Sequence, residues 1–108
     1  MTATEAIEVL AEHHEADADD RHRRVVTVDN KDNGERIRLR APLKATVESV
    51  IERMYAEFRL TRHPLDRLIC RGKGEDVFPL SALSLERYLH QGHCPNLHWS
   101  FAGDTGGA

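Results

Sequence analysis

Residues 25–40 read VVTVDNKDNGERIRLR. Both of its halves alternate apolar with polar residues, which is the period of a strand with one buried face. The apolar positions are Val26, Val28, Ile37 and Leu39. Between the halves, Asp32-Asn33-Gly34 supplies residues that tolerate the positive φ angles of a tight turn. The stretch therefore predicts a β-hairpin with one face in a core and one face in water.

A helix is predicted directly after the hairpin. Pro42 ends the second strand, and Thr46 is a good N-cap with Glu48 near the positive end of the helix. The apolar residues that follow keep the spacing of a buried helical stripe. They are Val47, Val50, Ile51, Met54 and Phe58. His63-Pro64 marks the end of the helical segment.

The rest of the chain predicts further strands and a helical turn. Residues 68–70 form a short third strand, and residues 77–80 form a short edge strand in which Pro79 is tolerated. Residues 84–90 form a helical turn, and residues 96–101 form the last strand. This order predicts an α+β fold in which one main helix packs across a four- to five-stranded mixed sheet, the β-grasp arrangement.

The first 24 residues form an acidic extension, with seven acidic residues against three arginines and a net charge of −4. Thr2 and Glu5 suggest a capping box, and Ile7 and Leu10 have helical spacing. We expect a short helix or a disordered segment that adds little to the core. Its two apolar residues are candidates for docking on a partner or for self-association with a second copy.

The composition bounds the class of protein. At 108 residues, 40% hydrophobic and 31% charged, the chain is one ordinary globular domain with appendages. A net charge of +1 outside the extension argues against nucleic-acid binding. The lack of a signal or a long apolar run predicts a cytoplasmic protein with no membrane partner. Cys70 and Cys94 lie in unlike contexts and indicate neither a disulfide framework nor a redox motif.

Three segments resemble the ubiquitin family. Residues 46–50, Thr-Val-Glu-Ser-Val, resemble the family's Thr-Ile-Glu-Asn-Val at the start of its helix. Residues 67–73, Arg-Leu-Ile-Cys-Arg-Gly-Lys, resemble its Arg-Leu-Ile-Phe-Ala-Gly-Lys. Residues 96–99, Asn-Leu-His-Trp, resemble its Thr-Leu-His-Leu. The matches keep their order and nearly their intervals, so the resemblance implies a ubiquitin-like domain over residues 25–101.

The tail, residues 102–108, contains Gly106-Gly107 followed by Ala108. Glycine lets an extended backbone pass through a narrow channel toward a catalytic centre. The resemblance implies that a peptidase removes Ala108 and that the Gly107 carboxylate is then activated with ATP and transferred through a thioester. The alternative is a frayed, glycine-rich terminus without a function.

The resemblance transfers the family's recognition surface in part. Ile69 matches its central isoleucine and His98 its neighbouring histidine, whereas Ser100 stands in place of a valine. Lys73 matches a lysine through which chains are built. The alternative for each is an ordinary exposed side chain. In the tail, Asp104 stands where the family has arginines, which implies a dedicated activating enzyme.

The chain thus resembles the ubiquitin-like proteins of bacterial operons that also encode activating-enzyme, conjugating-enzyme and metallopeptidase homologues. These enzymes and the target proteins are its expected partners. Two other functions stay open: a β-grasp sulfur carrier with a C-terminal thiocarboxylate, and a non-covalent ubiquitin-like adaptor.

Catalytic and metal sites find little support in the sequence. No nucleophile, base and orienting group can be recognised together, so we expect neither an enzyme nor a bound cofactor. The strongest candidates for metal ligands are His90, His93, Cys94 and His98. Three of them fall on one predicted loop and the fourth on a strand, which is not a clean zinc motif, so no metal site is predicted.

Overall fold

The structure is a computed structural model that describes residues 7–10 and 22–103. The predicted hairpin is present as β2 (Arg23–Asn30) and β3 (Arg36–Pro42), which pair antiparallel. Val26 lies opposite Leu39 in this register, so the alternating apolar residues of both strands share one buried face. Gly34 has φ +80°, the left-handed conformation that the turn requires.

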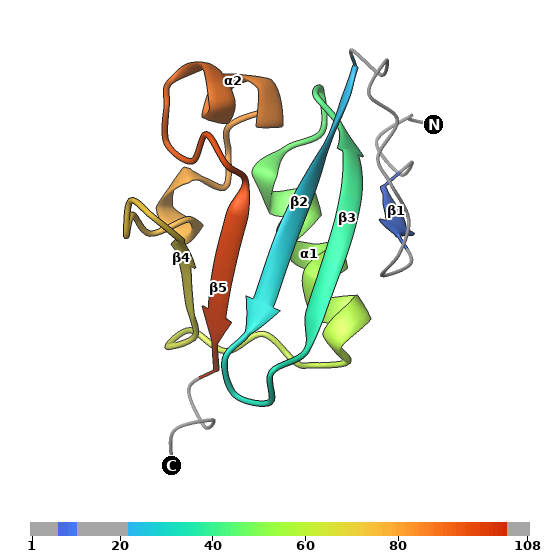
Figure 1. Cartoon of the computed structure of the whole chain (residues 1–108), viewed down its shortest axis with the longest axis vertical. Helices are drawn as coiled ribbons and strands as arrows, with labels where there is room; N and C mark the ends of the chain where they lie inside the picture. The colour runs from blue at the N-terminus through green and yellow to red at the C-terminus, as the bar shows by residue number, and fades with distance from the viewer. Residues whose placement is uncertain (1–6, 11–21, 104–108) are drawn as a thin grey trace.

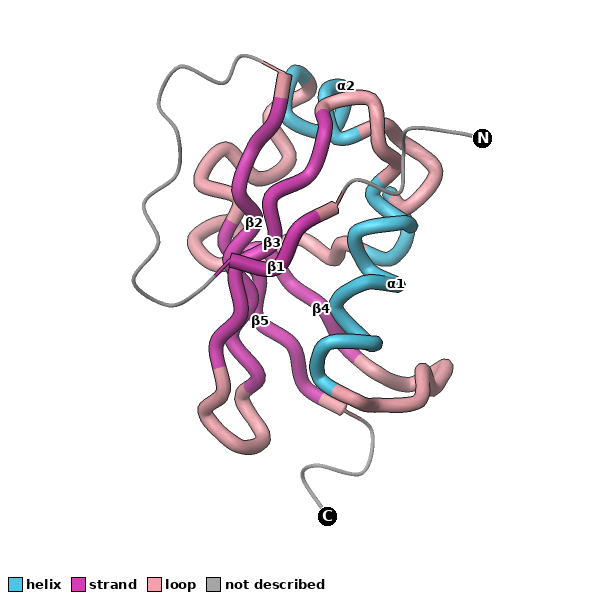
Figure 2. The backbone as a smooth tube through the Cα atoms, turned by 90° about the vertical axis from the view of Figure 1, so that its right-hand side faces the viewer, coloured by secondary structure: helices cyan, strands magenta, loops and turns pink. Residues whose placement is uncertain are grey.

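The main helix is α1 (Val47–Phe58). Thr46 caps it as predicted, because its Oγ1 accepts a hydrogen bond of 3.1 Å from the Ser49 amide. The helix ends at Arg59, which takes the left-handed conformation with φ 61°. Figure 2 shows α1 lying across one face of the sheet. No helix among residues 7–10 and 22–103 covers the opposite face of the sheet.

Two further strands complete the sheet on the other side of β2. β4 (Arg67–Cys70) pairs antiparallel with β5 (His98–Ala102), and β5 runs parallel to β2. The strand order is β1-β3-β2-β5-β4 (Figure 1). The last strand of the chain therefore lies inside the sheet, between β2 and β4. One main helix on a mixed five-stranded sheet of this order confirms the predicted β-grasp.

The core lies between α1 and the covered face of the sheet. Leu68 and Leu97 are both buried in it, at 0% and 5% exposure. Leu68 lies in β4 as predicted, whereas Leu97 precedes β5 and takes the left-handed conformation with φ 47°, so the last strand begins two residues later than predicted. Figure 1 shows α2 (Leu85–His90) closing one end of this layer, where residues 84–90 were predicted to be helical. Its Tyr88 accepts a hydrogen bond of 3.1 Å from the indole Nε1 of buried Trp99. Burial raises the pKa of Tyr88 to about 12, so the hydroxyl stays neutral.

The prediction of a short helix in the N-terminal extension is wrong for Glu8–Leu10. These residues form strand β1, which pairs antiparallel with β3. Ile7 and Val9, two residues apart, pack against the core, whereas Ile7 and Leu10 were expected to share a helical face. These residues form a strand because the edge of β3 offers backbone hydrogen-bond partners, whereas a helix of three residues would be too short to be stable alone. Residues 8–10 of the extension thus contribute to the fold. β2 begins at Arg23, which lies within residues 1–24, the predicted extension.

The predicted edge strand at residues 77–80 is also wrong. Phe78–Leu80 form a 3₁₀ turn, η2, with Pro79 near its start. Proline has no amide hydrogen to donate to a strand and its fixed φ suits a helical turn. Beside β4, the isolated bridge between Ile69 and Asp76 takes the place of a further strand.

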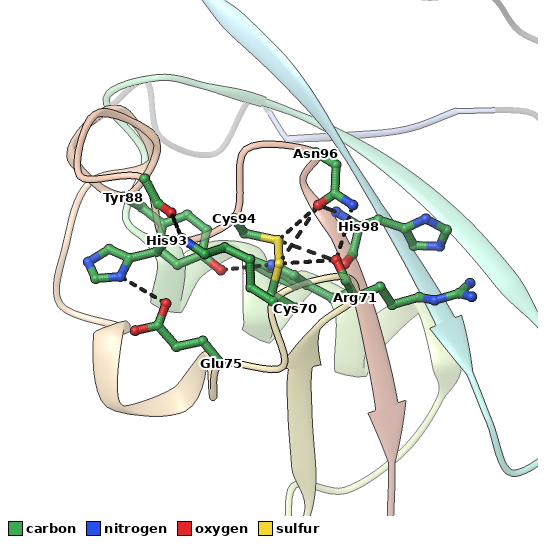
Figure 3. Close-up of a disulfide and its surroundings, with 11 residues drawn as sticks. Cys70, Arg71, Glu75, Tyr88, His93, Cys94, Asn96 and His98 are labelled. Carbon is green, nitrogen blue, oxygen red and sulfur yellow. Dashed lines mark hydrogen bonds and ion pairs between the residues drawn. A yellow bond between two sulfur atoms is a disulfide. The ribbon is translucent and has the colours of Figure 1, made fainter.

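The two cysteines form a disulfide, contrary to the sequence-based expectation. Cys70 ends β4 and Cys94 lies in the loop before β5, with their Cα atoms 5.7 Å apart (Figure 3). The pair spans 24 residues, and only the pairing of β4 with β5 brings its ends together. Disulfides are most common in oxidising compartments.

Among the described helices, none is long and apolar enough to cross a bilayer.

Candidate functional site

The first candidate surface is the open face of the sheet, opposite α1. Ile69 and Ser100 are direct partners in the β4–β5 register, and Ser100 is in turn level with Asp29 of β2. All three side chains are partly exposed. His98 lies two residues before Ser100 on the same face. The structure therefore brings together three of the predicted binding residues: Ile69, His98 and Ser100.

Asp29 organises this face, although the sequence analysis did not select it. Its carboxylate accepts hydrogen bonds from Arg36 Nε at 2.6 Å and Arg71 Nη1 at 2.7 Å. The Nε2 atom of His98 lies 2.8 Å from the same carboxylate. Hydrogen bonds from Arg36, then from His98 and Arg71, lower the pKa of Asp29 well below its ordinary value despite partial burial. His98 is thus held by an ion cluster beside Ile69.

Among the described residues, the open face carries more cations than anions. Six arginines stand on it, from β2, β3, β4 and the residue after β4: Arg23, Arg36, Arg38, Arg40, Arg67 and Arg71. Its carboxylates are Asp29 and, from β1, Glu8. The chain as a whole is acidic, with a net charge of −3. This face therefore suits an acidic partner more than the apolar contact inferred from Ile69 alone.

Lys73 lies apart from this cluster, in the turn after β4. Its Nζ donates a hydrogen bond of 2.6 Å to the Gly92 carbonyl in the loop after α2. The lysine is nevertheless exposed. It links two loops, and a chain-building role for it stays a prediction.

The second candidate surface lies where β5 leaves the sheet. Gly103 donates its amide to the Asp32 carboxylate at 2.8 Å, and Lys31 donates its amide to the Phe101 carbonyl at 2.8 Å. The hairpin turn thus holds the start of the tail. Asp104, Gly106, Gly107 and Ala108, which were predicted to act in recognition and conjugation, lie outside the described residues.

A pocket opens beside Gly103, between the tail base and the loop after α1. Its lining includes Leu60, Phe101 and Asp66. Asp66 is only 8% exposed and accepts hydrogen bonds from Tyr55 Oη at 2.7 Å and from the His63 amide at 2.9 Å. Burial, followed by the hydrogen bond to Asp66, raises the pKa of Tyr55 above its usual range. The hydrogen bonds of Asp66 with Tyr55 and His63 thus hold the loop after α1 next to the start of the tail.

Three of the four candidate metal ligands have other partners, and the fourth, His90, is exposed at the end of α2. Cys94 is in the disulfide, so it has no thiolate to offer. His93 lies between Glu75 at 3.1 Å and Gln91 at 3.0 Å, and its ring stacks on Tyr88. Figure 3 shows His93 and His98 on opposite sides of the disulfide. Within residues 7–10 and 22–103, no three metal-binding side chains converge.

Asn96 is a further residue that the sequence analysis missed. Its Nδ2 donates to the Arg71 carbonyl at 3.1 Å, and its Oδ1 accepts from the His98 amide at 3.3 Å (Figure 3). It therefore connects the end of β4 to the start of β5 beside the disulfide. Asparagine at a loop-to-strand junction is a recognisable signal for such a contact.

Comparison with known proteins supports the fold. One solved structure, reported as "Molecular Mimicry of SUMO promotes DNA repair", superposes with a TM-score of 0.51 and 20% sequence identity. The match covers 84% of this chain and 98% of the other. No protein-family model matches the sequence. No curated protein matches it either. At this identity the likeness concerns the fold, and this chain has a ubiquitin-like β-grasp fold.

Proposed function

We propose that this chain is a ubiquitin-like protein modifier, matured by a peptidase that cuts after Gly107. The observation that carries the proposal is the path of β5. This strand is held on both sides, by β2 and β4, and it leads through Gly103 toward Gly106-Gly107. A tail anchored in the middle of a sheet can be pulled into an enzyme groove while the domain stays folded.

The chemistry requires four steps. The Gly107 carboxylate attacks the α-phosphorus of ATP, and pyrophosphate leaves. A cysteine thiolate of the activating enzyme then displaces AMP and forms a thioester. A cysteine thiolate of the conjugating enzyme displaces the first thiolate and takes over the thioester. A target amine finally displaces the thiolate of the conjugating enzyme and forms an amide bond. In these steps the chain is the substrate, and it supplies the carboxylate and the surfaces that the enzymes bind.

The partner enzymes must accept an acidic tail and a cationic open face. Asp104 disfavours an activating enzyme that reads arginines with carboxylates. The arginines around Asp29 favour a partner surface with carboxylates of its own. We propose that Ile69, His98 and Ser100 form the centre of this contact. A bacterial operon setting and a cytoplasmic location belong to the same proposal, and in a reducing cytoplasm Cys70 and Cys94 would be free thiols rather than the disulfide of this structure.

A second candidate function is a non-covalent adaptor. It is favoured by the solved structure of similar fold, whose description is mimicry of SUMO. In an adaptor, the domain binds the machinery of a modifier and the tail does no chemistry. A sulfur carrier on the same fold is the third candidate, in which the terminal carboxylate becomes a thiocarboxylate.

Mass spectrometry of the protein recovered from its native host separates these functions. Amide bonds from Gly107 to other proteins support the modifier, sulfur on Gly107 supports the carrier, and an uncut Gly107-Ala108 bond supports the adaptor. In vitro, the purified chain is incubated with the candidate peptidase, then with the activating enzyme and ATP. Loss of Ala108 followed by an ATP-dependent thioester is expected.

Two controls sharpen this experiment. Gly107→Val should block both steps, because a branched side chain obstructs the narrow groove that accepts glycine. Thiol reductants reduce the Cys70–Cys94 disulfide and also cleave a thioester by thiol exchange, so hydroxylamine should be used to release the thioester. No cleavage after Gly107 with any candidate peptidase, together with no thioester from a chain ending at Gly107, would contradict the modifier.

A further inference from the structure

The Cys70–Cys94 disulfide joins the two segments that carry Arg71 and His98. Cys70 ends β4 directly before Arg71, and Cys94 lies four residues before His98. Arg71 Nη1 and His98 Nε2 both contact the Asp29 carboxylate, at 2.7 Å and 2.8 Å. The disulfide therefore connects two of the partners that hold the Asp29 carboxylate on the open face.

Hydrogen bonds join the same two segments beside the disulfide. The Arg71 amide donates to the His98 carbonyl at 2.7 Å, and Asn96 Nδ2 donates to the Arg71 carbonyl at 3.1 Å. Asn96 Oδ1 accepts from the His98 amide at 3.3 Å, which is a long hydrogen bond. Further along both loops, Lys73 Nζ donates to the Gly92 carbonyl at 2.6 Å. Hydrogen bonds near water are individually weak, so the covalent bond is the main constraint on the loop before β5.

The core beneath this loop has contacts of its own that do not pass through the sulfur atoms. The Thr27 amide donates to the carbonyl of buried Leu97 at 2.9 Å. Trp99 is fully buried, and its indole Nε1 donates to the Tyr88 hydroxyl. β5 also keeps its pairing with β2 and β4. Breaking the disulfide should therefore free residues 92–96 while the domain stays folded.

The loops that cover the disulfide give a reductant a route to it. Cys70 and Cys94 are 1% and 0% exposed, so a thiol must wait for a local opening. Asn96 is exposed, and its Oδ1 lies 3.2 Å from Cys94 Sγ and 3.7 Å from Cys70 Sγ (Figure 3). Residues 71–75 and 95–96 are exposed and lie in turns and loops. Such segments open at a lower free-energy cost than core strands, so the sulfur atoms can be reached without global unfolding.

We propose that the Cys70–Cys94 pair is a redox switch that sets the structure of the open face. In the oxidised state, the disulfide holds Arg71 and His98 against Asp29. In the reduced state, residues 92–96 are released, and the contacts of Arg71 and His98 with Asp29 loosen together. This inference goes beyond the proposed function and does not depend on the chemistry of the tail.

Two thiol molecules supply the electrons for reduction, and glutathione is the reagent for the test. The first glutathione thiolate attacks one cysteine sulfur, so the Cys70–Cys94 bond breaks, a mixed disulfide forms, and the other cysteine leaves as a thiolate. The second glutathione thiolate attacks the glutathione sulfur of the mixed disulfide and releases the remaining cysteine. The products are two protonated cysteines and glutathione disulfide, so two electrons and two protons have passed from two glutathione molecules to the protein. Glutathione disulfide reverses the exchange.

Thermodynamic linkage provides the first test. If the disulfide stabilises the contacts of Asp29, those contacts stabilise the disulfide by the same factor. The full-length protein is equilibrated in glutathione buffers of defined thiol-to-disulfide ratio, and its free thiols are alkylated and counted by mass spectrometry. Asp29→Asn should shift the equilibrium constant about two- to tenfold toward the reduced form, the effect of about one hydrogen bond. Glu48→Gln, which breaks an ion pair with Arg62 instead, is the matched control and should leave the constant unchanged.

NMR of the isotope-labelled protein in both redox states provides the second test. On reduction, the amide shifts should change in residues 70–76 and 92–100, and those of β3 should stay the same. The amides of Arg71 and His98 should exchange at least about fivefold faster in the reduced protein. The double variant Cys70→Ala, Cys94→Ala should resemble the reduced protein and should not respond to glutathione.

Three results would overturn the proposal. The first is an equal thiol–disulfide equilibrium constant for the wild-type protein and Asp29→Asn, because the open face and the disulfide would then be uncoupled. The second is a reduced protein in which the amides of Arg71 and His98 keep their shifts and exchange rates. The third is global unfolding of the reduced protein at room temperature, because the bond would then be a structural cross-link and not a switch.

Discussion

The amide of Gly103 donates a hydrogen bond of 2.8 Å to the carboxylate of Asp32 and so ties the start of the tail to the β2–β3 turn. The residues meet across 71 positions of sequence, because β5 ends beside the hairpin turn. A Cβ on Gly103 would lie 3.2 Å from that carboxylate oxygen, so glycine allows the approach. The tail therefore leaves the domain in a direction set by the hairpin.

Asp32→Ala should release the tail base while leaving the domain folded. We expect amide exchange of Gly103 to become at least about fivefold faster, because an exposed hydrogen bond contributes about 1 kcal/mol. Hydrogen exchange followed by NMR measures this, with the melting temperature as a control for the fold. Asp32→Asn keeps a carbonyl acceptor and should show a smaller effect. Equal exchange in all three proteins would contradict the role of Asp32.

Reduction of the Cys70–Cys94 disulfide should destabilise the domain. Loop-closure entropy for a separation of 24 residues corresponds to about 3 kcal/mol. For a domain of this size we expect the melting temperature to fall by more than about 10 °C. Thermal unfolding with and without reductant, with alkylation and mass spectrometry to count free thiols, measures the effect. The double variant Cys70→Ala, Cys94→Ala should melt at the lower temperature in both conditions.

Asp29→Asn should lower stability at neutral pH and much less in acid. The folded-state pKa of Asp29 is depressed by Arg36, His98 and Arg71, so its contribution is complete above the ordinary aspartate pKa of about 4. That contribution is lost as pH falls below 4 toward the depressed value. We expect a deficit of about 1–2 kcal/mol at pH 7. Urea unfolding from pH 7 to pH 2 should show the two curves converging, and a constant gap would contradict this.

Leu68→Ala should cost about 2–5 kcal/mol, because the side chain is fully buried between the sheet and α1. Chemical unfolding measures the loss. Ile69→Ala, one residue along and on the open face, is the matched control and should change stability by less than about 1 kcal/mol. A melting temperature unchanged by Leu68→Ala would mean that the register of β4 is wrong.

Most of the fold could be predicted from the sequence, because the patterns that indicate its strands and its main helix are local. The alternation around Val26 and Leu39 and the Thr46 cap predict the hairpin and α1 without knowledge of distant residues. The features that were predicted wrongly depend on contacts between segments that lie far apart in the sequence. Glu8–Leu10 is a strand because the edge of β3 is available, and Cys70 meets Cys94 because β4 lies beside β5.

The site was predictable to a smaller extent. Ile69, His98 and Ser100 were selected by resemblance, and they do share one face of the sheet. Asp29 was missed because its three partners come from different elements, and no local pattern joins them. One of these contacts was accessible, since the register of the hairpin places Asp29 opposite Arg36. The conjugation residues at 106–108 stay predictions.

The central position of β5 also has a mechanical consequence. A force applied through the tail acts along β5, and the hydrogen bonds to β2 and β4 on its two sides share the load at the same time. Such a shear geometry resists extraction more than an edge strand, whose bonds open one after another. The Cys70–Cys94 bond adds a covalent loop that a threading motor cannot pass as a single strand. A pull on this end would therefore meet the resistance of both neighbouring strands and of the disulfide-closed loop together.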